Sequence, residues 1–136
     1  MTKRRSFLKA TMAVTAGAAV GNSAIASAGK KEKFSGVIYS KENPGKWDNK
    51  VNSHAPKVSV EGKQVTIKTL HGMSEEHFIV RHTLVCEHGK VLGEKTFYPT
   101  DKKAVSTFTL PEKHAKKLFA TSFCNKHDLW VTEFTV

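Results

Sequence analysis

Three short segments of the chain concentrate side chains that bind metal ions. Together they contribute four histidines and one cysteine: His54, His71, His77, Cys124 and His127. Neutral imidazoles suit iron, copper, zinc and nickel, and a thiolate adds a soft, strongly donating ligand. A lone histidine or an isolated Cys-x-x-His pair is a weak signal, whereas five such donors in one small domain are a much more specific sign of a metal site.

The remaining histidines and the second cysteine favour structural roles. The chain has seven histidines and two cysteines, which excludes a disulfide-dense scaffold and a four-cysteine metal site. We expect Cys86 to be a small buried hydrophobe and His82 to be a hydrogen-bonded core histidine rather than a ligand. A disulfide between Cys86 and Cys124 is the alternative, and it would remove the thiolate from the site. His88 and His114 are expected on the surface.

Alternating apolar and polar residues predict the strands that must position these donors. Val58 and Val60 alternate with polar neighbours, residues 61–63 form a turn, and Val65 and Ile67 repeat the alternation in a partner strand. The two strands therefore form a predicted hairpin.

The segment 77–86 predicts another strand, followed by a hairpin turn at 87–90. One of its faces is expected to carry Phe78, Val80, His82, Leu84 and Cys86. This apolar face would contact the core.

Further strands are predicted over 91–98, 104–110, 117–123 and 129–136. We expect Lys41–Asn52 to form a loop, and Glu112–Lys117 to form at most one helical turn. About seven short strands separated by turns indicate an all-β, immunoglobulin-like β-sandwich. Loops gather at the two ends of a sandwich, so the three donor segments can converge there.

The first 28 residues have the features of an export signal. A basic Lys3-Arg4-Arg5 precedes a stretch rich in Ala, Gly, Thr and Ser that ends in the small-x-small pattern Ala26-Ser27-Ala28. The paired arginines resemble a twin-arginine signal, so we expect a periplasmic protein without a stable membrane span after cleavage. An uncleaved signal would leave it membrane-anchored. Residues 29–44 are then a flexible arm, and 45–136 form the metal-binding domain.

The positive charge of the chain does not indicate a nucleic-acid partner. The formal charge is +10, and removing the four basic residues of the signal, which has no acids, leaves +6. The basic residues after residue 28 are lysines spread along the chain, with Arg81 as the one arginine. No arginine-rich or aromatic-interleaved basic motif is present, and export makes nucleic acid an unsuitable partner.

The residues around the donors resemble those of the superoxide reductases, the family of neelaredoxin and the catalytic domain of desulfoferrodoxin. The similar motifs are His54-x-Pro56, His71-x-Met73-x-x-x-His77-Phe-Ile and Cys124-Asn-x-His127-x-x-Trp130. The resemblance covers about residues 45–136, and the segment 122–130 is its most specific part. The family fold is an immunoglobulin-like β-sandwich, in agreement with the strand pattern.

The resemblance implies a mononuclear iron that cycles between Fe2+ and Fe3+. Carried over by motif, the equatorial ligands are His54, His71, His77 and His127, and the axial ligand is Cys124. One position stays open for superoxide, which the family reduces by one electron to hydrogen peroxide. The chain lacks the N-terminal four-cysteine iron domain of the two-iron members, so an external electron donor is implied.

One departure from the family pattern bears on catalysis. Many members carry Glu-Lys directly before the first histidine, where the lysine is thought to attract superoxide and help deliver protons. Asn52 and Ser53 occupy those positions here. Lys50, and in second place Lys46, lies in the same loop as a candidate replacement, and the alternative is that both are solvated surface lysines.

Two other functions compete with superoxide reduction. The missing Glu-Lys pair leaves open a non-catalytic exported iron-binding or electron-transfer module of the same fold. A blue-copper site uses two histidines and a cysteine, often with a methionine. Four clustered histidines exceed that set and no methionine follows Cys124, so copper is disfavoured. The sequence leaves the oligomeric state, including a homo-oligomer, open.

Overall fold

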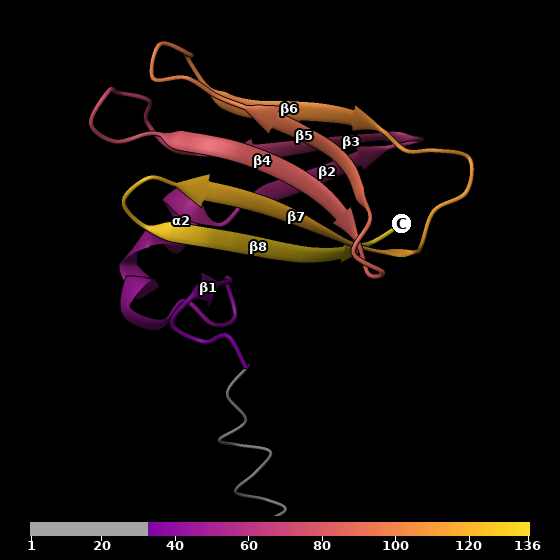
Figure 1. Cartoon of the computed structure of the whole chain (residues 1–136), viewed down its shortest axis with the longest axis horizontal. Coiled ribbons are helices and arrows are strands. Elements are labelled where there is room, and N and C mark those ends of the chain that lie inside the picture. Colours follow the sequence, from indigo (N-terminus) through magenta and orange to yellow (C-terminus); the bar gives the residue numbers. More distant parts are fainter. Residues whose placement is uncertain (1–32) are drawn as a thin grey trace, which may run out of the picture. The chain divides into compact units, whose positions relative to one another are not determined.

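A computed structural model describes residues 33–136 of the chain. The predicted signal (1–28) and the first residues of the predicted arm lie outside the described residues. The described part forms two β-sheets that pack face to face (Figure 1). This arrangement confirms the prediction of an all-β, immunoglobulin-like sandwich.

One sheet has five strands and the other has three. The larger sheet has the order β1-β8-β7-β4-β5 and the smaller has the order β2-β3-β6. The strands are β1 (Ile38–Tyr39), β2 (Lys57–Glu61), β3 (Gln64–Thr69), β4 (Ile79–Cys86), β5 (Val91–Thr96), β6 (Ala104–Thr109), β7 (Lys117–Cys124) and β8 (Asp128–Thr135). All pairs are antiparallel except β1 with β8.

The predicted hairpin over 58–67 is confirmed as β2 and β3. Val58 pairs with Ile67 and Val60 with Val65. Gly62 in the turn has a φ of 60°, a left-handed conformation that glycine adopts without a Cβ clash. The alternation buries Val65 and Ile67 completely, so this hairpin supplies one wall of the core.

The main core lies between the two sheets. Its buried members include Val65, Ile67, Leu84, Leu118 and Ala120. Cys86 belongs to the same cluster and is a free thiol, as predicted for a small buried hydrophobe. Burying side chains of this size stabilises the fold by roughly 1.5–3 kcal/mol each, so the core holds the strand ends in place.

A β-bulge changes the expected face of β4 at its start. The register shifts between Ile79, which pairs with Cys124, and Arg81, which pairs with Phe123. Ile79 is fully buried, whereas Phe78 and Val80 are half-buried. The predicted alternation therefore holds for His82, Leu84 and Cys86 but is wrong before the bulge, because one extra residue reverses the faces of a strand.

The loop prediction for Lys41–Asn52 is wrong for its second half. Gly45–Lys50 forms the 3-10 helix η1, and Val51–His54 forms the short helix α2. These turns carry no long apolar stripe, so helical periodicity could not reveal them. Tertiary contact holds them instead, since Trp47 and Val51 pack against buried Tyr39, Ala55 and Trp130.

Within the segment predicted as a flexible arm, Ile38 and Tyr39 form β1 beside β8. Tyr39 is buried, stacks at a tilt on Trp130 and donates a hydrogen bond to the Gly36 carbonyl. Among the described residues, no helix is long and apolar enough to cross a membrane.

Candidate metal centre

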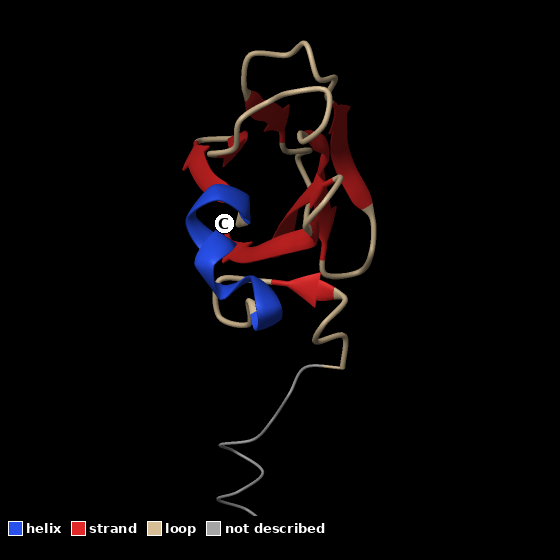
Figure 2. Cartoon of the chain, turned by 90° about the vertical axis from the view of Figure 1, so that its left-hand side faces the viewer, coloured by secondary structure: helices blue, strands red, loops and turns tan. Residues whose placement is uncertain are grey.

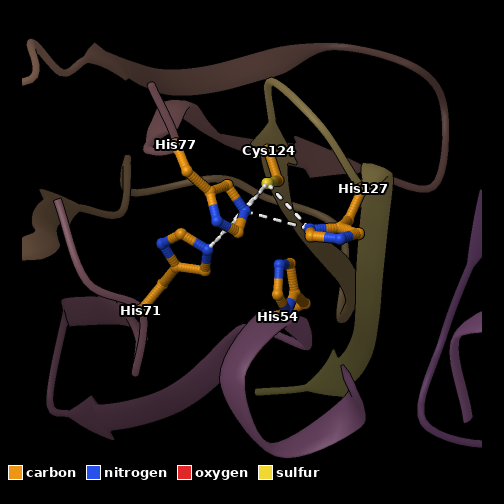
Figure 3. A group of neighbouring side chains, drawn as sticks. All are labelled: His54, His71, His77, Cys124 and His127. Atoms are coloured by element: carbon orange, nitrogen blue, oxygen red, sulfur yellow. Dashed lines mark hydrogen bonds between the residues drawn. The ribbon is translucent and has the colours of Figure 1, made fainter. Parts of the chain in front are cut away.

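The five predicted donors meet at one end of the sandwich. His54 is the last residue of α2, and His71 and His77 lie in the loop between β3 and β4. Cys124 ends β7, and His127 lies in the turn before β8. Figure 2 looks onto this end of the molecule, beside the helical turns. The donor atoms of all five residues lie within 4.8 Å of one another (Figure 3).

The distances between the donors are those expected around one metal ion. His77 Nε2 lies 3.0 Å from His71 Nε2, 3.0 Å from His127 Nδ1 and 3.1 Å from Cys124 Sγ. Cys124 Sγ lies 3.6 Å from His127 Nδ1 and 4.0 Å from His71 Nε2. Two nitrogen ligands at right angles, each about 2.1 Å from a metal, are about 3.0 Å apart. The donors therefore surround a position suited to a metal.

The other ring nitrogens fix which atoms face this position. His54 Nδ1 lies 3.2 Å from the Lys50 carbonyl and 2.8 Å from Ser53 Oγ, and His71 Nδ1 contacts the Gly72 carbonyl. A carbonyl only accepts, so each Nδ1 carries the proton and each Nε2 presents a lone pair. Metal-binding histidines are commonly oriented by such contacts to the backbone.

One buried atom has no hydrogen-bond partner. In the part of the chain that the structure describes, His54 Nε2 is the single buried side-chain nitrogen or oxygen left unpaired. It points toward the other donors in Figure 3. An unsatisfied buried polar atom costs about 1–3 kcal/mol, and a metal ion would remove that cost. Four imidazoles and a thiolate are a donor set that fits iron, so the residues present suit the group that the resemblance implies.

Asn125 ties the two loops of the centre together. Its side-chain oxygen accepts a hydrogen bond from the Phe78 N–H at 3.0 Å, and its side-chain nitrogen donates to the Glu76 carbonyl at 3.0 Å. Its own N–H donates to the Phe78 carbonyl. These contacts join the residues beside His77 to the residue after Cys124. Asn125 is the second residue of the Cys-Asn-x-His motif, but the motif alone does not reveal this role.

Two tryptophans border the centre. Trp47 meets the His127 ring edge-on at 4.7 Å and donates to Asp128 Oδ2 at 3.2 Å. Trp130 is buried, lies tilted 5.9 Å from the His54 ring and donates to the His127 carbonyl at 2.8 Å. The two tryptophans therefore fix His127 in the β7–β8 turn, since Trp47 contacts its ring and Trp130 its backbone carbonyl.

Asp128 begins β8 with a φ of 67°. This left-handed conformation is uncommon for residues with a Cβ, and aspartate tolerates it better than most. The turn between Cys124 and His127 can therefore be tight without a glycine.

Burial keeps the imidazoles neutral. Burial, followed by the charges of His71 and His127, lowers the pKa of His54 to about 4. Burial also lowers the pKa of His71, His77 and His127 below its ordinary value, and the charge of Lys50 adds to this in all three. Neutral imidazole is the form that binds metals, so the site is prepared for a cation at neutral pH.

The thiol of Cys124 is held in its protonated form without a metal. Burial raises the pKa of Cys124, and the backbone N–H groups of Lys126 and His127 oppose that rise. A coordinating thiol must lose its proton. Metal binding at this site would therefore release one proton from Cys124.

An open hollow of about 400 Å³ lies against one side of the centre. Its lining includes Lys50, Ser53, His54, His71, Met73 and His77. No acidic residue lines it, so a small anion entering it would meet cationic and neutral groups. The hollow is a route from solvent to the donors.

The two candidate lysines predicted from the sequence lie in different surroundings. Lys50, the first candidate, borders the hollow. Lys46 instead lies over the Trp47 ring, 4.9 Å from its centroid. The exposed Lys126 was missed as a charged neighbour, and it adds to the lowering of the pKa of His77 and His127.

The structure also tests the roles predicted for the other three histidines and for Cys86. His82 is buried and hydrogen-bonded on both ring nitrogens, as predicted. The Cys86–Cys124 disulfide is wrong, because both thiols are free and lie at opposite ends of the neighbouring strands β4 and β7. His88 and His114 are exposed, as expected.

Comparisons with known proteins agree with this geometry. The sequence model of the desulfoferrodoxin family matches residues 46–133. The superoxide reductase neelaredoxin from Ignicoccus hospitalis is 28% identical, with a TM-score of 0.63 over 77% of this chain and 98% of that chain. No curated protein sequence matches the chain significantly.

Two further solved structures share the fold. A variant of the superoxide reductase neelaredoxin from Archaeoglobus fulgidus, in its reduced form, is 27% identical, with a TM-score of 0.52 over 62% of this chain and 89% of that chain. The superoxide reductase (1Fe-SOR) from Giardia intestinalis is 23% identical, with a TM-score of 0.58 over 62% of this chain and 99% of that chain. At that identity the second similarity concerns the fold alone.

Proposed function

Because this chain belongs to the desulfoferrodoxin family, we propose that it is an iron-dependent superoxide reductase. The iron ligands would be His54, His71, His77, Cys124 and His127. The observation that carries the proposal is the convergence of these five donor atoms within 4.8 Å, with the His54 Nε2 lone pair buried and unpaired. The similar structures from Ignicoccus hospitalis and Archaeoglobus fulgidus are named superoxide reductases.

The overall reaction consumes one superoxide, one electron and two protons and forms one hydrogen peroxide. The four histidines and Cys124 would hold the iron, and an iron ion bound there would supply the electron by one-electron redox chemistry. The protein supplies the rest: Lys50 O and Gly72 O hold two imidazoles in the ligating tautomer, and Asn125 holds the His77 loop against the Cys124 turn. Such contacts to ligands tune metal affinity and electronic properties.

The hollow beside the centre attracts the anionic substrate. Its lining contains Lys50 and no carboxylate. In the described part of the chain Lys50 forms no ion pair, since the salt bridges involve Lys63, Arg81 and Lys117. An unpaired cation at the mouth of a small site raises the local concentration of an anion and is screened by salt.

Lys50 and Ser53 are the groups we assign to substrate binding in place of the family Glu-Lys pair. Both border the hollow. The Ser53 hydroxyl contacts His54 Nδ1 and lies 3.2 Å from the Lys50 carbonyl. A lysine ammonium can also donate a proton to a reduced oxygen species, so Lys50 has both a charge and a proton to contribute.

We further propose that the protein acts outside the cytoplasm. The twin-arginine-like signal of residues 1–28 supports export to the periplasm, with an external donor supplying the electrons. Expression of the full chain with Arg4 and Arg5 both changed to lysine tests the route. The precursor should accumulate in the cytoplasm, and unchanged periplasmic recovery would contradict this proposal.

The direct test of activity is the reaction of the Fe2+ protein with superoxide. Pulse radiolysis should show fast oxidation of the iron, one equivalent of hydrogen peroxide and no oxygen. Lys50→Met should slow this step several-fold at low salt and weaken its salt dependence. Lys46→Met, whose lysine covers Trp47 rather than the hollow, is the matched control.

A different outcome would favour the non-catalytic alternative. If the protein binds one iron but superoxide oxidises it no faster than free Fe2+ in the same buffer, the chain is an iron-binding or electron-transfer module. The specific feature behind that alternative is the replacement of the Glu-Lys pair by Asn52 and Ser53.

A further inference from the structure

Met73 lies between the hollow beside the metal centre and the core. It lines the hollow of about 400 Å³ that contains Lys50, and it packs against a buried cluster that includes Ile79, Phe97 and Cys124. Its side chain is half-buried. One part of this side chain is therefore within reach of a small molecule in the hollow, whereas another part contacts the core.

Packing, rather than hydrogen bonding, holds Met73 in place. Within the described residues Met73 makes no hydrogen bond, although its neighbours do. The His71 N–H donates to the Thr69 carbonyl at 2.8 Å, and the Ser74 N–H donates to the His77 carbonyl at 3.1 Å. The middle of the segment between two proposed iron ligands therefore depends on the apolar contacts of one side chain.

The two cysteines are better shielded from solvent than Met73. Cys124 is 1% exposed and Cys86 is 6% exposed, and neither lines the hollow. The other methionines, Met1 and Met12, fall in the predicted signal, so Met73 is the single methionine after residue 28. Among the sulfur atoms of the described residues, that of Met73 is the one open to an oxidant in the hollow.

The proposed reaction forms an oxidant at this place. It releases one hydrogen peroxide for each superoxide, and the hollow connects the donors with solvent. Hydrogen peroxide oxidises a methionine thioether to the sulfoxide. Unlike a thiol, a thioether has no proton to lose before it reacts. The product therefore passes a side chain that it can oxidise.

We propose that Met73 is a site of oxidation by hydrogen peroxide, and that its oxidation weakens the hold of its loop on the iron. The inference rests on the proposed function. The sulfur of Met73 bonds to one peroxide oxygen, the O–O bond breaks, and the other oxygen leaves as water with both protons. The sulfur loses two electrons and the peroxide gains them, so no further oxidant is needed.

The sulfoxide no longer fits the contacts that hold Met73. Its oxygen is a polar acceptor, and the cluster that Met73 packs against consists of Ile79, Phe97, Ala104 and Cys124. A buried polar atom without a partner is unfavourable, so the oxidised side chain should turn toward the hollow. The loop between His71 and His77 then loses its apolar contact, and iron retention responds to accumulated product.

The first measurement identifies the modified residue. Metal-free protein, which excludes iron-catalysed radical oxidation, is treated with hydrogen peroxide, then with catalase, and is digested with trypsin. Cleavage after Lys68 and Arg81 releases the peptide 69–81, which contains Met73 and no cysteine. Its mass should rise by one oxygen before either cysteine peptide changes. The rate should lie within about threefold of that of the synthetic peptide 69–81, because Met73 lines the open hollow.

The second measurement follows the iron. Protein oxidised in this way is loaded with Fe2+ and mixed with a chelator, and release should be about tenfold faster than from unoxidised protein. Met73→Leu keeps an apolar side chain of similar volume that cannot form a sulfoxide, so peroxide treatment should leave its release rate unchanged. Met73→Gln, with a polar side chain of similar length, should release iron faster than wild type without any peroxide.

An unmodified peptide 69–81, under conditions that oxidise the synthetic peptide, would overturn the proposal because Met73 would then be closed to the hollow. Oxidation of Cys124 before Met73 would also overturn it, since the ligand itself would be the modified residue. So would equal iron release from oxidised and unoxidised wild type, or equal acceleration by peroxide in Met73→Leu.

The proposed function can fail separately. If superoxide does not oxidise the Fe2+ protein, the proposed function falls, but the mass of the peptide 69–81 still decides whether peroxide modifies Met73.

Discussion

The core histidine His82 and the four histidines at the end of the sandwich differ in how their ring nitrogens are satisfied. In the core, His82 Nε2 contacts Thr69 Oγ1 and Nδ1 contacts Ser106 Oγ, both at 2.8 Å. At the end of the sandwich, His77 Nε2 contacts a ring nitrogen of His71, a ring nitrogen of His127 and the sulfur of Cys124. His54 Nε2 has no partner at all.

The difference separates a structural histidine from a metal ligand. A hydroxyl can donate to one atom and accept from another, so His82, Thr69 and Ser122 form a closed network. Imidazole lone pairs that face one another cannot satisfy each other without a proton or a cation between them. Both groups have a lowered pKa because of burial, so the pKa alone does not distinguish them. The partners do.

The largest expected effect is loss of iron when one of the four histidines at the end of the sandwich is removed. His77 Nε2 lies closest to three other donors, so His77→Ala should lower iron affinity by more than about 100-fold, since changes to contacts of ligands alone cost 10–100-fold. Competition with a chelator measures this affinity. His88→Ala, in an exposed turn, is the control, and equal retention of iron in both variants would remove His77 from the site.

Removing His82, the hydrogen-bonded core histidine, should lower the stability of the fold and leave iron binding unchanged. His82→Ala leaves a cavity and unpaired hydroxyls in the core, so the free energy of unfolding should fall by about 3 kcal/mol. Urea unfolding of the metal-free protein measures this change. Molecules that remain folded should still bind one iron each. If His82→Ala abolished iron binding in folded protein while stability was unchanged, the distinction between the two groups would fail.

The pH dependence of stability should also identify His82. Its pKa is lowered from 6.5 to about 4 by burial, so the unfolded chain binds more protons than the folded chain between these values. Stability is therefore complete above about pH 6.5 and is lost as the pH falls toward 4, by up to about 3 kcal/mol for this group. His82→Gln keeps hydrogen-bonding atoms but does not titrate, so its urea midpoint should fall less steeply than that of wild type over this range. Parallel curves would contradict this assignment.

The smallest effect should come from Asn125, which touches the loops rather than the metal. Asn125→Ala removes the side-chain bonds to Phe78 N and Glu76 O, and iron should dissociate about tenfold faster. Asn125→Asp keeps the acceptor for the Phe78 N–H and should give an intermediate rate. Stopped-flow release to a chelator orders the three proteins. An unchanged rate in Asn125→Ala would show that the loops hold their positions without this residue.

The sequence predicted the strands and the donor set better than the connections between them. Alternation identified Val65, Ile67, Leu84 and Cys86 as inward-facing, because a strand buries every second residue. It could not locate the bulge at Ile79–Arg81, since an extra residue leaves the composition of the strand unchanged. The bulge matters for the site, because it places the buried Ile79 opposite Cys124.

The surroundings of the site depended on contacts between distant segments. The Cys-Asn-x-His motif marked Cys124 and His127, but the bonds from Asn125 to Glu76 and Phe78 required the folded chain. The helical turns that end at His54 were likewise invisible, because Trp47 and Val51 are held by packing against Tyr39 and Trp130 rather than by helical periodicity.

The proposed function depends on one iron bound through Cys124 and the four clustered histidines. The most direct measurement is the iron content of the purified mature protein together with its visible spectrum after mild oxidation, for wild type, Cys124→Ser and Cys86→Ser. We expect about one iron per chain and a sulfur-to-iron charge-transfer band in wild type and Cys86→Ser, and loss of that band in Cys124→Ser. Absence of iron, or a band that persists without Cys124, would contradict it.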